Sequence, residues 1–241
     1  GTGYTTYQAQ TLQTKPVVVN KRKYRALDLS SLDYNRQPYL DFEKSIGLEA
    51  EKLADDVLAD VFSIVTAANY GATTTAAMLA TAFDVDDALL LRRLCNEANW
   101  PMPGRSLVLD ATFEENLLKD TRVQSVLTAG QTGAVTEAKL PRVAGFDVIP
   151  VALLPANGLE KIAGMAVIPS ALFYASAPVK PHPILARNTV EYQILRDPDS
   201  GITLEYRRFG DPVKDTVVEV IEVNYGYAVG ESAALKRIFT P

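Results

Sequence analysis

The beginning of the chain separates its charges into a basic arm, with no acidic residue before Asp28, and a long acidic, amphipathic segment that follows it. The basic residues of the arm are Lys15, Lys21, Arg22, Lys23 and Arg25. The acidic residues of the segment and its approach are Asp41, Glu43, Glu49, Glu51, Asp55, Asp56 and Asp60. An extended basic stretch that is poor in apolar residues cannot bury enough surface to pack by itself. The arm therefore needs a partner surface.

The arm is expected to be extended. Residues 4–25 have no helical period but contain β-forming runs at 4–7 and 17–19. Pro16 stands directly before the second run, and a proline at the start of a strand favours an edge ribbon or a projecting hairpin over a central strand.

The acidic segment is expected to be a helix. From Ala50 to Ala68, apolar residues recur at the spacing of one helix face, which predicts a long helix near residues 46–68. At about 1.5 Å per residue, this helix would span roughly 35 Å. The sequence Asn-Tyr-Gly at 69–71 supplies its stop.

Three aspartates, Asp84, Asp86 and Asp87, open the next apolar-periodic run. Carboxylates at this position cap the first turn of a helix and are stabilised by its dipole. The same three side chains could instead bind a divalent cation, but the matched glycine and distal glutamate of a calcium loop do not follow. The pattern favours a capped helix over a metal site.

The rest of the chain mixes strands and short helices. A capping box at 112–115 predicts a short helix, and Pro169 is expected to open another. Two alternating runs around the turn at 197–201 predict a β-hairpin. Strands are expected at 105–109, 143–149, 190–196, 202–208, 217–223 and 233–239. This mixture predicts an α+β (mixed) fold.

Residue types that mark catalysis are scarce. The single histidine, His182, lies between two prolines, where an exposed loop residue is expected. It could act as a general base for Ser170 or Ser176, but neither serine has the Gly-x-Ser-x-Gly context of a nucleophile elbow. The 29 acidic residues allow many carboxylate pairs, and their spacing selects none. We therefore expect no catalytic site, no cofactor and no metal.

A covalent crosslink between chains is an alternative use of the basic arm. Lys21 or Lys23 could join the amide of Asn188 or Asn224 in a neighbouring chain, if an acid in an apolar pocket assisted proton transfer. Nothing in the spacing of these residues selects such a bond over ordinary ion pairs.

Composition excludes several classes of protein. The 241 residues, 47% of them hydrophobic, suffice for one large domain or two small ones. A formal net charge of -5 leaves no basic field for broad nucleic-acid binding. Cys95 is the one cysteine, so an intrachain disulfide is impossible, and we expect its side chain to be buried. No apolar run reaches the roughly 18 to 20 residues that span a bilayer.

Short stretches of the sequence follow one another in a characteristic order. They are Glu51–Val57, Arg105–Leu109, Phe113–Asp120, Ala144–Val148 followed by Leu153–Pro155, Val167–Leu172 and Tyr225–Val229. Together with the extended arm and the long helix, this order resembles that of a tailed-phage major capsid (coat) protein with the Hong Kong 97 type fold. The resemblance covers nearly the whole chain.

The resemblance implies a division of the chain into five parts. Residues 1–44 would form an extended loop and its return to a peripheral domain, and residues 45–72 would form the spine helix of that domain. Residues 73–184 would build an axial domain, residues 185–225 the peripheral strands, and residues 226–241 a C-terminal strand of the axial domain.

The resemblance also implies a structural role, and no enzyme. A protein of this kind self-assembles into the icosahedral head shell of a tailed bacteriophage or prophage and encloses its DNA. Its partners would be other copies of itself, in hexamers and pentamers, with scaffolding and portal proteins, and without sequence-specific nucleic-acid binding or a membrane. It would assemble in the cytoplasm of the bacterial host and reside in the virion. The alternatives are an encapsulin-like cellular shell protein and a carboxylate-dependent α/β enzyme.

Family members begin with an N-terminal arm, whereas this sequence begins inside the expected extended loop, so we expect an upstream part to have been removed. In a shell, the basic arm of one copy could lie over the acidic helix of a neighbour, where opposite charges would set the register. This hypothesis assigns an inter-subunit contact to Lys15, Lys21, Arg22, Lys23, Arg25, Glu49, Asp56 and Asp60.

Overall fold

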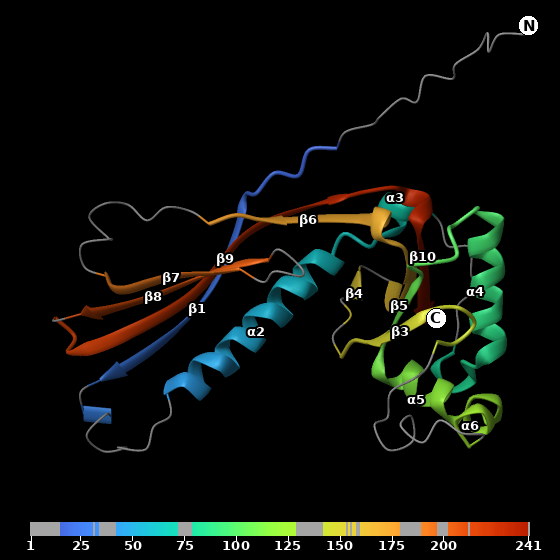
Figure 1. The fold of residues 1–241 in the computed structure, drawn as a ribbon, viewed down its shortest axis with the longest axis horizontal. Helices are drawn as coiled ribbons and strands as arrows, with labels where there is room; N and C mark the ends of the chain where they lie inside the picture. The colour runs from blue at the N-terminus through green and yellow to red at the C-terminus, as the bar shows by residue number, and fades with distance from the viewer. Residues whose placement is uncertain are drawn as a thin grey trace, which may run out of the picture.

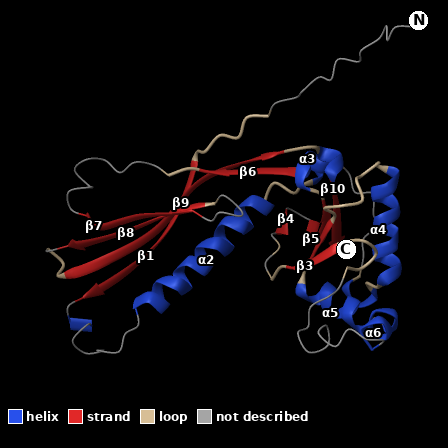
Figure 2. Ribbon diagram, viewed as in Figure 1, coloured by secondary structure: helices blue, strands red, loops and turns tan. Residues whose placement is uncertain are grey.

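The structure contains two β-sheets, one long and one short, with most of the helices gathered around the short one (Figures 1 and 2). It is a computed structural model that describes residues 15–30, 32–33, 42–71, 79–128, 142–152, 154, 156–157, 160–178, 189–196, 202–211 and 213–240. The expected features at 4–7, 182, 188 and 197–201 lie outside these residues.

The long sheet is antiparallel and is built around its longest strand. Its order is β1 (Lys21–Ser30), β9 (Thr216–Val229), β8 (Thr203–Asp211) and β7 (Thr189–Arg196), and β6 (Leu172–Ser176) pairs with the far end of β9. Strands β7 and β8 form the predicted hairpin. The basic strand β1 lies at the sheet edge, although it begins after the valine run at 17–19 on which the expected edge ribbon was based.

Helix α2 (Phe42–Phe62) lies along one face of the long sheet, where it meets β1 and β9 (Figure 1). The core between them is small, and its fully buried members are Leu53, Val61, Ile221, Val223 and Tyr225. Full burial of one such aliphatic side chain stabilises the fold by about 1.5–3 kcal/mol. The apolar stripe of α2 is therefore what orients the helix on the sheet.

The short sheet has the order β10 (Leu235–Thr240), β5 (Glu160–Val167), β2 (Ser106–Leu109) and β3 (Asp147–Pro150), and β4 (Ala156–Asn157) pairs with β5. Strands β2 and β3 are parallel and the other pairs are antiparallel.

The short sheet belongs to the part of the molecule that holds the remaining helices. These are α3 (Ala67–Tyr70), α4 (Val85–Glu97), α5 (Ala111–Lys119) and α6 (Thr121–Thr128), with short 3-10 turns η1 (Ala80–Ala82), η2 (Pro169–Ala171) and η3 (Ser232–Ala234). The core here is much larger than that under α2. Its fully or almost fully buried side chains include Phe83, Leu91, Leu107, Phe113, Leu117, Phe146 and Ile238.

Three connections join the two parts: α2 to α3, β5 through η2 to β6, and β9 through η3 to β10. Hydrogen bonds to backbone carbonyls of these connections hold this region together. The amide of Gly230 donates to the carbonyl of Ala171 at 2.8 Å, and the Tyr70 hydroxyl donates to the same carbonyl at 2.9 Å. The Trp100 indole donates to the carbonyl of Ala233 at 2.8 Å.

Two helix predictions were wrong in their extent. The acidic helix ends at Phe62 and not near residue 68, because Ile64, Val65 and Thr66 are β-branched and fit poorly in a continuing helix. A separate short helix, α3, follows, with Thr66 as its N-cap. Pro169 opens only the 3-10 turn η2, after which the chain enters β6 and pairs with β9.

Smaller details also differ. Asp110 caps α5, and its carboxylate accepts the amide of Thr112, so the capping box predicted at Thr112 does not form. The strand expected at 143–149 is shorter and later, at Asp147–Pro150, preceded by an isolated bridge between Val143 and Phe146. The valine run at 17–19 belongs to no strand.

Candidate functional site

The basic arm meets the acidic helix within a single chain. Alternation along β1 turns Lys21, Lys23 and Arg25 toward α2, and the ladder between β1 and β9 sets their positions. Asp56 and Asp60 lie one turn apart on α2 and face these cations.

Part of this contact is a cluster near the end of α2. The Lys21 ammonium lies 2.9 Å from the nearer oxygen of Asp60, donates to the Tyr227 hydroxyl, and lies 4.1 Å from the centroid of the Tyr227 ring. The Tyr225 hydroxyl donates to Asp60 at 2.7 Å. One carboxylate therefore holds together the edge strand, the central strand and the helix.

The environment shifts the ionisation of this cluster. Burial alone would raise the pKa of Asp60, but the hydrogen bonds from Lys21 and Tyr225 outweigh it and lower that pKa. Burial would lower the pKa of Lys21, but the hydrogen bonds to Tyr227 and Asp60 raise it. Burial, together with the hydrogen bond to Asp60, raises the pKa of Tyr225. Both members of the ion pair are therefore charged over a wide pH range.

The neighbouring residues of the predicted contact are also engaged inside the chain. The Lys23 ammonium donates to the backbone carbonyl of Asp56 at 2.5 Å, and the guanidinium of Arg25 binds the Asp56 carboxylate. Glu49 pairs with Lys52 at 2.6 Å along the helix.

These contacts supply a partner surface within the chain for the β1 part of the arm. The inter-subunit role proposed for these residues stays a prediction. Among the cations of this set, Lys15 is exposed and the Arg22 side chain is 57% exposed, so both remain accessible to solvent.

The opposite face of the long sheet carries a second charged network, which sequence reasoning missed. Glu222 is buried there and binds the guanidinium groups of Arg22 and Arg207. The Asn224 amide donates to Glu222 and to Glu205, each at 3.2 Å. Burial alone would raise the pKa of Glu222, but the hydrogen bonds from Arg22 and Asn224, together with the charge of Arg207, outweigh it and lower that pKa. Glutamates within the valine-rich run at 217–223 were the available signal, since an acid inside a central strand needs a partner.

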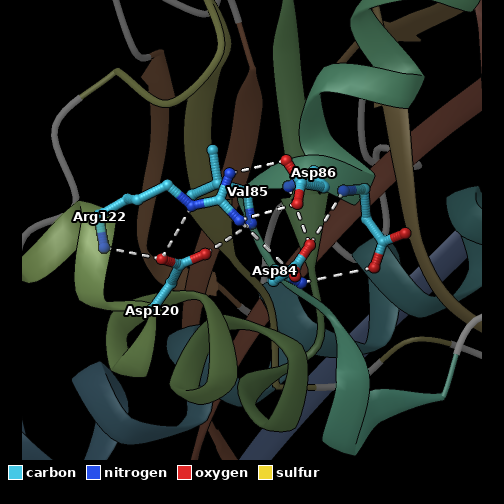
Figure 3. Close-up of polar contacts among 6 residues, drawn as sticks. Asp84, Val85, Asp86, Asp120 and Arg122 are labelled. Atoms are coloured by element: carbon cyan, nitrogen blue, oxygen red, sulfur yellow. Dashed lines mark hydrogen bonds and ion pairs between the residues drawn. The ribbon is translucent and has the colours of Figure 1, made fainter.

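The expected aspartate cap is confirmed at the start of α4. The Asp84 carboxylate accepts the amides of Asp86 and Asp87, at 2.8 Å and 3.2 Å, and the Asp87 carboxylate accepts the Asp84 amide in return. The positive charge that lies beside these acids is the guanidinium of Arg122. Figure 3 shows Arg122 reaching Asp86, with contacts of 2.7 and 2.8 Å.

Asp120 joins the same cluster and caps two helices at once. Its carboxylate accepts the amide of Val85 at 3.0 Å and that of Arg122 at 2.8 Å (Figure 3). The hydrogen bond from Val85 is the largest cause of the lowered pKa of Asp120. The cluster is a clasp between the first turns of α4 and α6. Within the described part of the chain, no group of three or more His, Cys, Asp or Glu could hold a metal ion.

The cysteine and the two serines considered above are buried or make polar contacts within the fold. Cys95 is buried, as expected, and burial raises the pKa of its thiol to about 11. The Ser176 hydroxyl accepts the amide of Thr203, and the Ser170 hydroxyl lies 3.4 Å from Glu231. Asn224 lies on the face of the sheet opposite that of Lys21 and Lys23. The crosslink alternative concerns neighbouring chains and stays a prediction.

The surface has a small open pocket of about 180 Å³. It is lined by Ser106, Val167, Ile168, Pro169 and Leu172, none of which is ionisable near neutral pH. Of the helices that the structure describes, none combines the length and the apolar character needed to cross a membrane.

Comparison with known proteins gives a consistent result at the level of structure. No protein-family model and no curated protein matches the sequence. The capsid structure of the cyanophage P-SCSP1u matches over 100% of this chain and 81% of that chain, with a TM-score of 0.65 and 15% identity. The mature capsid of bacteriophage PhiM1 matches over 100% and 79%, with a TM-score of 0.56 and 12% identity.

A cellular shell is also similar. The SrpI encapsulin complex from Synechococcus elongatus PCC 7942 matches over 91% of this chain and 73% of that chain, with a TM-score of 0.52 and 11% identity. At such identities the likeness is one of fold. The chain has the mixed α+β, Hong Kong 97 type fold of these shell proteins, which confirms the fold class expected from the sequence.

Proposed function

We propose that this chain is the major capsid protein of a tailed bacteriophage or prophage. In this role, many copies assemble into hexamers and pentamers of an icosahedral shell that encloses DNA and becomes part of the virion. The observation that carries the proposal is the similarity to a phage capsid structure over the entire chain, including both sheets and the helix that lies on the long sheet. Assembly in the host cytoplasm, with scaffolding and portal proteins as partners, belongs to the same proposal.

The two sheets support a division of the chain into two domains. We assign the long sheet and α2 to the peripheral domain and the short sheet with its helices to the axial domain. Two strands depart from the division proposed from the sequence: β6 lies within 73–184 but pairs with β9 in the long sheet, and β9 continues past residue 225 to Val229. The peripheral domain would thus include Leu172–Ser176 as well as residues 185–229.

The inter-subunit contact is best sought among charges that remain exposed. Lys15 of the arm is exposed, and Glu51 and Asp55 lie on the exposed side of α2. Opposite charges at such positions would steer identical chains into register. Reversal of Lys21 would also remove its ion pair with Asp60, so it would test the subunit as much as the shell.

Electron microscopy of the full-length gene product tests the main proposal. We expect closed shells of uniform size, and a product that stays monomeric across conditions of salt, pH and concentration would contradict it. Lys15→Glu should reduce the yield of shells at unchanged subunit stability. The matched variant Lys214→Glu changes an exposed lysine in the turn between β8 and β9 and should leave the yield unchanged.

An encapsulin-like shell is the second candidate, and the similarity to the SrpI complex favours it. The contents of purified particles distinguish the two. Nuclease-protected DNA of defined length supports the phage capsid, whereas a stoichiometric protein cargo without DNA, identified by mass spectrometry, supports the encapsulin.

A further inference from the structure

The N-terminal arm does not leave the subunit at the end of β1 but continues across the long sheet. Residues 15–20, here called the arm segment, precede β1 and belong to no strand. The segment passes β9 next to Gly226. The Lys15 ammonium then lies 3.4 Å from the carbonyl oxygen of Gly230, which directly follows β9. In Figure 1 the ribbon can be followed from β1 past β9.

The crossing is possible because residue 226 has no side chain. A Cβ atom at this position would lie 1.9 Å from the carbonyl oxygen of Val18, 2.6 Å from its carbonyl carbon and 3.0 Å from the Cα of Val19. All three atoms belong to the backbone, so no side-chain rotation could relieve the clash. Any larger residue would force the arm segment away from the sheet.

The geometry also identifies the face that the arm crosses. Tyr225 and Tyr227 point toward α2, where their hydroxyls meet Asp60 and Lys21. Because neighbouring residues of a strand face opposite sides, a side chain at 226 would point to the other face. The arm segment therefore lies over the face that α2 leaves open.

The arm segment is docked by alternate residues. Val17 and Val19 are half-buried, whereas Val18 is 63% exposed and Lys15 is exposed. The segment thus presents one side to its own sheet and a basic, partly apolar side to the exterior. Within the described part of the arm, the ion pairs come from the β1 residues Lys21, Arg22 and Arg25, and the outer side of the arm segment faces solvent.

We propose that Gly226 is a positioning residue that fixes the path of the arm across the long sheet, so that its outer side meets a second copy of this chain. This proposal rests on the proposed shell function. The glycine is required by the close approach of two backbone segments and not by its conformation, since no positive φ is found at residue 226.

A matched pair of substitutions isolates the crossing. Gly226→Ala introduces the clash, whereas Gly210→Ala places the same methyl group on β8 of the same sheet, with nothing within 4 Å. Both glycines are strand residues without a positive φ, so the effect of alanine on the unfolded chain is the same in the two variants.

The rate at which an introduced cysteine reacts with a thiol reagent shows whether the arm segment is docked on the sheet. The native Cys95 is buried with a raised thiol pKa, so at neutral pH only an introduced cysteine reacts while the core is folded. Val17→Cys places a thiol on the docked side, and Val18→Cys gives the rate of an exposed one. We expect Gly226→Ala to raise the labelling rate at position 17 about fivefold, toward the rate at position 18. Gly210→Ala should leave it unchanged.

Two readouts decide the proposal. Labelling is measured on unassembled full-length subunits, with the reactivity of Cys95 as the check that the core stays folded, and shell yield is measured by electron microscopy. A faster position 17 together with fewer shells in Gly226→Ala alone supports the proposal. An unchanged labelling rate, or a faster rate with a normal yield of shells, overturns it. If the parent chain forms no shells, the shell function fails, while the labelling result still decides whether Gly226 holds the arm.

Discussion

The two sheets of this protein are held together by different forces. The short sheet and its helices surround a large apolar core that includes Phe83, Phe113 and Ile238. Under α2, the long sheet has a small apolar core, and charged groups line both of its faces. Apolar burial is insensitive to pH and salt, whereas partly exposed ion pairs depend on both. The long sheet is thus the part of the subunit whose stability responds most to conditions.

The largest effect is expected in the large core. Phe113 is 1% exposed, and its ring lies 5.2 Å from that of Phe83. Phe113→Ala should lower the free energy of unfolding by about 3–5 kcal/mol, because it leaves a cavity that the surrounding helices cannot fill. Urea denaturation followed by circular dichroism measures the change. Leu89→Ala, at a position that is 44% exposed on α4, should change it by no more than about 0.5 kcal/mol. A loss below about 1 kcal/mol at Phe113 would contradict the assignment of this core.

A smaller effect is expected where the long sheet meets α2. Asp60→Asn keeps the shape of the side chain but removes the charge that pairs with Lys21, and we expect a loss of about 1–2 kcal/mol. Asp55→Asn, on the exposed side of α2, is the control and should be nearly neutral. Hydrogen exchange should show reduced protection in β1 and α2 but not in β2 and β5. Equal losses in both sheets would mean that they unfold as one unit.

The contribution of Asp60 should also depend on pH. Its pKa is lowered in the folded chain from a reference value of 3.8, so the unfolded chain binds the proton more tightly. The stabilisation is therefore present above the reference value and is lost as the pH falls through the folded pKa. The difference in stability between the native chain and Asp60→Asn should shrink as the pH is lowered below about 4. A difference that stays constant down to pH 2 would assign the effect of the substitution to packing.

The smallest effect is expected at the clasp between α4 and α6. Arg122 reaches Asp86 and Asp120 from a side chain that is half exposed, and water screens such ion pairs. Arg122→Gln should lower the stability only slightly, and most of that loss should disappear at high salt. Asp120→Ala should cost more than Arg122→Gln, because it also removes the cap that serves both helices. The reverse order would show that the charges, and not the cap, hold this corner.

Local features of the fold were predictable where the signal and its cause lie within a few residues. The Asp84 cap, the hairpin of β7 and β8, and the apolar face of α2 are of this kind. The end of α2 was predicted too late, because the apolar period continues past Phe62 into β-branched residues that pack in a turn. The turn at Pro169 was misread because a proline at the first helical position looks the same whether one turn follows or several.

The sequence by itself determined the amphipathic α2, the aspartate cap of α4 and the order of segments that resembles a capsid protein. Only the tertiary structure decided which charges meet. Lys21 reaches Asp60 across 39 residues because α2 packs on β1, and Arg22 reaches Glu222 across 200 because β1 pairs with β9 in a fixed register. The requirement for Gly226 likewise arises from the arm that crosses it. Contacts between distant segments depend on register and crossing, and neither leaves a periodic pattern along the chain.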